Sequence, residues 1–166
     1  MATTPLYPRV IGLDVHQAKI SACAIAEQAD GTVTVEHREL GAFQRDRRAL
    51  AEWAKAFGPT VVVMERTGVD WKSPYAALER AGIVAGVVTA RHVQAVPGRQ
   101  TDIADAPWLA LLARAGWRRG SFIPPAERRD LRRVARQRQQ LGGLLASAKN
   151  RLHQVLTDAG LRLQVL

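Results

Sequence analysis

Four carboxylates of this 166-residue chain occupy positions where secondary-structure elements begin or end. Asp14 and Glu65 each close a short apolar run, and Asp102 and Asp105 follow three residues apart in a later segment. Carboxylate oxygens are the ligands that Mg²⁺ prefers. Two such ions about 4 Å apart can activate the attacking oxygen and neutralise the leaving oxygen of a phosphodiester. Because clustered carboxylates repel and take up protons, convergence of all four would indicate a site for Mg²⁺ or Mn²⁺.

Each acid taken alone has a simpler interpretation. Charged residues usually lie at the surface, so Asp14 or Glu65 could merely mark the end of a strand. Asp102 and Asp105 would share one face of a helix, but acids at a helix N-terminus also favour its macrodipole. Because proline is free of cost only in the first helical turn, Pro107 means that either the regular helix starts nearer Asp105 or its first turns are kinked. The metal-site hypothesis therefore depends on a fold that brings the four acids together.

The apolar pattern predicts such a fold. Three strands come first and form an antiparallel meander with an Asp30-Gly31 turn, and helices and strands then alternate. The predicted strands are residues 9–14, 19–26, 32–39, 60–65 and 83–88, and the predicted helices are 45–57, 71–81 and 108–115. This order is that of the α/β ribonuclease-H-like fold, a mixed five-stranded sheet with flanking helices. In that sheet the first and fourth strands are parallel neighbours, so Asp14 and Glu65 would lie side by side.

The pattern changes after residues 121–125. Residues 126–159 predict one long helix or two, in which a row of residues steps by alternating threes and fours, as in a coiled coil. The row is Leu131, Val134, Arg138, Leu141, Leu145, Ala148, Leu152 and Val155. Gly142 and Gly143 weaken the helix by ~1 kcal/mol each. We therefore predict a catalytic domain at 1–120 and a basic helical segment at 121–166 that links or oligomerises.

The charge balance indicates a polyanionic partner. Lys and Arg number 24 against 15 Asp and Glu, a formal net charge of +9, which favours nucleic-acid binding. Arg99, in a Gly-containing loop before the acids, is a candidate phosphate contact. The long helix adds Arg128, Arg129, Arg132, Arg133 and Arg136, although a solvated helix face is the alternative.

Other residues add less. The single cysteine, Cys23, excludes an intramolecular disulfide and is predicted to lie in the core. His16 could approach Asp14, and Lys19 and Arg66 could contact a phosphate or pair with a carboxylate. With no signal-peptide pattern and no apolar run near ~20 residues, we expect a cytosolic protein without a membrane partner.

Four segments are recognisable as a set. They are IGLDVH at 11–16, MERTGV at 64–69, VPGRQTDIADA at 96–106, and SFIPP at 121–125 with the Arg-rich helix and KNRL at 149–152. In this order the chain resembles, over nearly its whole length, the DEDD transposases of bacterial insertion sequences. Their N-terminal domain is similar to the Holliday-junction resolvase RuvC, and the pilin-gene-inverting recombinases belong to the same group.

The resemblance implies a function. It implies that Asp14, Glu65, Asp102 and Asp105 are the DEDD metal ligands, and that the chain cleaves and exchanges DNA strands in transposition. It also implies DNA as a partner, a structured guide RNA, assembly as a dimer or tetramer, and a nucleoid-associated place in the bacterial cytoplasm.

The chain departs from the family pattern at three points. Gln100 stands where the family usually has Lys, and Pro107 where it usually has a polar residue. The family's second domain carries a serine thought to act as nucleophile, so we expect a chain ending at Leu166 to be incomplete alone.

Two alternatives stay open. One is a catalytically incomplete DNA- or RNA-binding and assembly fragment of such a transposase. The other is an actin-like ATPase, because Gly12-Leu13-Asp14 after a strand also opens that fold, but no Gly-rich phosphate loop follows.

Overall fold

The structure, a computed structural model, describes residues 5–66, 68–89, 93, 105–116 and 120–161. The chain divides into two compact units, Met1–Phe122 and Ile123–Leu166. Each unit is described by itself below. The predicted division between residues 120 and 121 lies close to this one.

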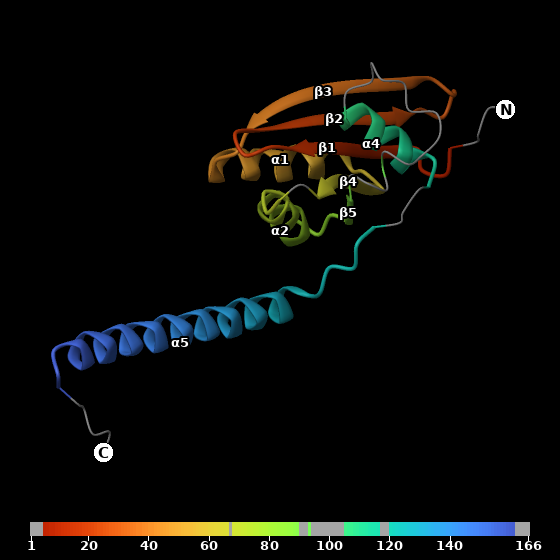
Figure 1. Cartoon of the computed structure of the whole chain (residues 1–166). Helices are drawn as coiled ribbons and strands as arrows, with labels where there is room; N and C mark the ends of the chain where they lie inside the picture. Colours follow the sequence, from red (N-terminus) through yellow and green to blue (C-terminus); the bar gives the residue numbers. More distant parts are fainter. Residues whose placement is uncertain (1–4, 67, 90–92, 94–104, 117–119, 162–166) are drawn as a thin grey trace. The chain divides into compact units, whose positions relative to one another are not determined.

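The first unit is built on one five-stranded sheet (Figure 1). Strands β1 (Arg9–Val15), β2 (Lys19–Glu27) and β3 (Val33–Gly41) are antiparallel neighbours. Strand β4 (Val61–Arg66) pairs parallel to β1, and β5 (Ala85–Thr89) pairs parallel to β4. The strand order is β3-β2-β1-β4-β5. The predicted mixed sheet of the ribonuclease-H-like fold is therefore confirmed.

Among the described residues, helix α4 covers one face of the sheet and helices α1 and α2 cover the other (Figure 1). They are α1 (Gln44–Phe57), α2 (Lys72–Arg80) and α4 (Asp105–Arg114). Gly58 ends α1 with a left-handed φ of 66°, a conformation that glycine adopts without steric cost. Helix α4 begins three residues before the predicted start at 108, because Pro107 falls in its first turn, where no backbone donor is lost.

The core lies on both faces of the sheet. Residues Val61, Val62, Val63 and Met64 of β4 are all buried, as expected for a strand covered by helices on both sides. Trp53, Trp71 and Trp108 are buried, while Trp117 lies outside the described residues.

Cys23 is fully buried, as predicted. Burial raises the pKa of its thiol to about 11, because a thiolate would lose its hydration there. The protonated thiol is a poor nucleophile, so Cys23 is a packing residue in the folded domain.

The second unit is dominated by α5 (Ala126–Asp158), one uninterrupted helix of 33 residues that continues through Gly142 and Gly143. None of its residues is buried. No helix among the described residues is long and apolar enough to cross a membrane.

Candidate metal centre at the carboxyl ends of the parallel strands

Two of the four predicted acids are neighbours in the sheet. Strands β1 and β4 run parallel and in register, and Leu13 pairs with Met64. Asp14 and Glu65 come next on the two strands, so the sheet holds their backbones about one strand spacing apart, ~4.8 Å. Both residues are half-buried, and 18% of the Asp14 side chain is exposed. Equivalent positions on adjacent strands face the same way, so both carboxylates belong to one face.

That face is the one covered by α4. Side chains alternate along a strand, so Asp14 shares its face with Gly12. A Cβ atom built on Gly12 would lie 2.2 Å from the backbone oxygen of Ala106 and 2.4 Å from the backbone nitrogen of Ala110. The backbone of α4 therefore passes directly over Gly12, in contact that only glycine permits.

The direction of α4 brings the third acid to the same end of the sheet. At the C-terminal end of α4, the backbone oxygen of Arg114 accepts hydrogen bonds from the amides of Leu6 (2.9 Å) and Tyr7 (3.2 Å). The Arg114 guanidinium also pairs with Glu27, at the end of β2. These contacts fix that helix end beside the start of β1. Helix α4 is thus antiparallel to β1, and its first residue, Asp105, belongs to the end where Asp14 and Glu65 stand.

His16 contacts the first acid directly. Its Nε2 lies 2.9 Å from Oδ2 of Asp14, and 57% of its side chain is exposed. The bond follows from a tight β1–β2 connection, in which the His16 amide donates to the Lys19 oxygen at 2.9 Å. The sequence suggested this approach only through the spacing of two residues. The contact leaves Oδ1 of Asp14 for another ligand.

Lys19 is engaged elsewhere. Its Nζ donates to Oε1 of Glu39 on β3 at 2.9 Å. Of the two roles predicted for Lys19, pairing with a carboxylate is the one observed, and its partner is none of the four site acids.

Part of the predicted site cannot be placed. Asp102, Arg99 and Gln100 lie outside the described residues, as does the side chain of Arg66. Among the residues that are described, no group of three His, Cys, Asp or Glu side chains is close enough to hold a metal ion. Asp14 and Glu65 are therefore neighbours on the sheet, and Asp105 belongs to the same sheet end without completing a three-ligand group with them. This oxygen-only donor set suits Mg²⁺ or Mn²⁺ rather than a soft metal.

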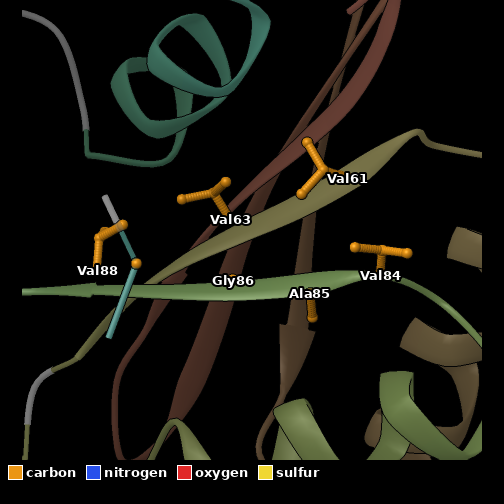
Figure 2. A pocket seen from close by; sticks show the side chains of 7 residues that line it. Val61, Val63, Val84, Ala85, Gly86 and Val88 are labelled. Atoms are coloured by element: carbon orange, nitrogen blue, oxygen red, sulfur yellow. The ribbon is translucent and has the colours of Figure 1, made fainter. Parts of the chain in front are cut away.

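The pocket in Figure 2 is of a different kind. It lies on β4 and β5 and is lined by Val61, Val63, Val84, Ala85, Gly86, Val88 and Gly120. None of these side chains can ligate a metal or transfer a proton. The pocket therefore offers an apolar surface, and the chemistry-bearing groups gather instead at the carboxyl ends of β1 and β4.

The predicted arginines of α5 lie on its surface. Arg128, Arg132, Arg133 and Arg136 are exposed. Arg129 is half-buried because its Nη1 donates to the Pro124 oxygen at 2.9 Å. Arg133 pairs with Asp130 at 3.2 Å, one helical turn away. The first half of α5 therefore presents a dense positive charge to solvent.

The strand order, with its one antiparallel meander and two parallel strands, defines a ribonuclease-H-like domain. The family model of the IS110-type DEDD transposases matches residues 11–160, and the chain belongs to that family. The predicted resemblance is thus confirmed over both units. No protein with a curated description matches the chain.

Several solved structures are similar to the chain. Thermus thermophilus RuvC in complex with a Holliday junction substrate shares 14% identity and a TM-score of 0.49, over 68% of this chain and 99% of that one. A second structure of Thermus thermophilus RuvC shares 16% identity, with a TM-score of 0.43 over 71% and 84%. Fowlpox virus resolvase with Holliday junction DNA shares 12%, with a TM-score of 0.46 over 64% and 99%.

Proposed function

We propose that this chain supplies the metal-dependent DNA-cleaving domain of an insertion-sequence transposase. Membership of the transposase family places it among proteins of DNA cleavage and recombination. The observation that carries the finer proposal is the in-register pairing of β1 and β4, which sets Asp14 beside Glu65 on the face of the sheet that α4 covers.

In this proposal Asp14, Glu65, Asp102 and Asp105 hold Mg²⁺ or Mn²⁺. Bound there, the ions would activate the attacking oxygen and neutralise the leaving one. The protein's own residues prepare the site. The sheet fixes the backbones of Asp14 and Glu65 side by side, and His16 holds Oδ2 of Asp14 at 2.9 Å, restricting rotation of that carboxylate.

DNA is the proposed substrate, with a structured RNA and further copies of the chain as partners. The net charge of +9 favours approach of a polyanion. The exposed arginines of α5 support contacts to a phosphate backbone. Arg99 would contact a phosphate close to the four acids. Strand exchange in transposition is proposed for the assembled transposase, and the serine-bearing domain that the resemblance implies would complete it.

The decisive experiment joins metal binding to DNA cleavage. Titration calorimetry with Mg²⁺ and Mn²⁺, and nicking of supercoiled plasmid, would be measured for the wild-type chain, Asp14→Asn and Asp158→Asn. The control removes the same charge from the end of α5. We expect saturable metal binding in the wild type and the control and none in Asp14→Asn, and we expect nicking, with water as the attacking nucleophile in place of the serine, to follow the same pattern.

Two results would contradict the proposal. Nicking that is equal in Asp14→Asn and the wild type would exclude this site as the source of activity. DNA binding without metal binding in all three proteins would instead support the second candidate, a binding and assembly fragment, which the exposed arginines of α5 favour.

A further inference from the structure

Helix α5 carries a row of apolar side chains that are exposed along its length. Seven of its large apolar residues are more than half exposed: Leu131 70%, Val134 64%, Leu141 56%, Leu144 67%, Leu145 58%, Leu152 57% and Val155 65%. A helix with such a stripe is normally covered by another element. The stripe runs from Leu131 to Val155, 25 residues whose ends lie ~36 Å apart along the helix.

The spacing of this stripe is the same from either end. The seam positions are 131, 134, 138, 141, 145, 148, 152 and 155, so the steps are 3, 4, 3, 4, 3, 4 and 3 residues in both directions. Turning the helix end for end about its midpoint, near residue 143, superimposes every seam position on another. Leu131 then falls on Val155, Val134 on Leu152, and Leu141 on Leu145. A second copy laid antiparallel would match the seam layer by layer.

Arg138 discriminates between the two orientations. In a parallel pair, Arg138 would face its own copy, and two guanidinium groups would meet inside an apolar seam at a large desolvation cost. In the antiparallel pair, Arg138 faces Ala148, the smallest seam residue. The arginine stem can then lie across the alanine while its charged end reaches water.

The charge distribution favours the same orientation. Six arginines lie in the first half of α5, at 128, 129, 132, 133, 136 and 138, whereas the second half has only Lys149 and Arg151 as cations. A parallel pair would set the two arginine-rich halves side by side, where like charges repel. An antiparallel pair sets each of them beside the weakly charged half of its partner.

Leu144 supports the position of the midpoint. It lies one residue outside the seam, yet 67% of it is exposed. In the antiparallel pair centred near residue 143, Leu144 lies beside the two-fold axis and its copy lies two residue positions away on the other side of that axis. The three leucines at 141, 144 and 145 would then form, with their copies, an apolar cluster at the centre.

We propose that α5 pairs with α5 of a second copy of this chain as an antiparallel two-helix coil, with its two-fold axis beside residue 143. The pairing rests on the proposed function only in making α5 the assembly helix. It assigns the orientation and the contacts: Leu131 to Val155, Arg138 to Ala148, and Leu141 to Leu145 of the opposite copy.

Disulfide trapping in the full chain tests the orientation. Leu131→Cys and Val155→Cys would be prepared with different affinity tags, then oxidised either alone or after co-expression. The native Cys23 is buried with a raised thiol pKa, so the wild-type chain serves as the unreactive control. We expect a covalent dimer containing both tags after co-expression. Neither variant should trap itself alone, because its two cysteines would lie ~36 Å apart.

The outcomes separate cleanly. Self-trapping of Leu131→Cys alone, without mixed dimers, would establish a parallel pair and overturn the proposal. No trapping in any combination, with a monomer by sedimentation equilibrium, would overturn self-association by α5. Arg136→Cys mixed with Asn150→Cys, both on the outer side of the helix, should not trap and controls for random collision. DNA nicking by the same preparations reports separately on the proposed function, since the site acids belong to the other unit.

Discussion

The two units of this chain handle apolar side chains in opposite ways. In the sheet domain, Ile11, Leu13 and Met64 are completely buried. In α5, residues of the same kind are more than half exposed, and no residue is buried. The sheet domain therefore has a core of its own, whereas a helix of this kind gains most of its stability from what packs against it. The packing of the sheet domain can therefore be tested within a single chain, whereas the packing of the apolar stripe on α5 can be tested only together with a partner.

The largest expected effect is a loss of DNA nicking that leaves the pairing of α5 unchanged. Glu65→Gln removes a charge from the carboxylate pair, and we expect DNA nicking to fall at least ~100-fold, because metal-assisted charge stabilisation is worth several kcal/mol. Trapping of α5 cysteines should not change. Glu52→Gln, a matched substitution at an exposed position of α1, should nick DNA like the wild type. A Glu65→Gln chain of normal activity would remove Glu65 from the site.

The second effect is on the stability of the sheet domain alone. Gly12→Ala would place a methyl group 2.2 Å from the Ala106 oxygen, and we expect a loss of about 2–3 kcal/mol, as for an overpacked core. Thermal unfolding measured by circular dichroism would show it. Gly86→Ala, in strand β5 of the same sheet with nothing within 4 Å, should change stability by less than about 0.5 kcal/mol. Equal midpoints for the two variants would contradict close packing of α4 on β1.

A smaller effect of opposite sign is expected in α5. Gly143→Ala meets nothing within 4 Å and should stabilise the helix by about 1 kcal/mol, because alanine loses less backbone entropy there. Circular dichroism should show a higher helix content, or a higher midpoint temperature for the loss of helix. Gly31→Ala is the control: it also meets nothing, but its φ of 83° lies in the left-handed region, so it should lose stability. Lower helix content in Gly143→Ala would contradict this expectation and would indicate that a partner helix approaches α5 closely at the glycine.

The smallest effect concerns nucleic-acid affinity. Arg132→Gln on the exposed face of α5 should lower the slope of log affinity against log salt by about 1, because one phosphate contact is lost. Fluorescence anisotropy of labelled DNA at several salt concentrations would measure it. Arg48→Gln carries the same charge change onto exposed α1 and should leave the slope as it is. Equal slopes for Arg132→Gln and the wild type would show that Arg132 contacts no phosphate.

The parts of the structure that follow from local pattern were predictable from the sequence. The apolar run of β4, the alternation in β2 and the glycine after α1 each placed an element to within a few residues. The neighbouring positions of Asp14 and Glu65 followed from strand order, because parallel pairing of two strands that both end in an acid leaves little freedom. The buried tryptophans were predictable as well, since large aromatic side chains usually pack in the core.

Other features depend on contacts between distant segments, which no local pattern encodes. The early start of α4 depends on where Pro107 falls within its first turn. The role of Gly12 depends on a helix almost a hundred residues away along the chain. The partner of Lys19 is fixed by β2–β3 register, which brings Glu39 within reach. The placement of Asp102 and Arg99 remains a prediction.

The contact between Gly12 and α4 also bears on how the site comes apart. The backbones of Asp14 and Glu65 belong to the hydrogen-bond ladder of β1 and β4, whereas the backbone of Asp105 belongs to α4, which packs against the sheet. Proteins open in cooperative pieces whose free energies range from near zero up to that of global unfolding. An opening that lifts α4 would therefore separate Asp105 from the carboxylate pair while the strands stay folded. In hydrogen exchange, the amides of α4 would then exchange as one group, ahead of those of β1 and β4.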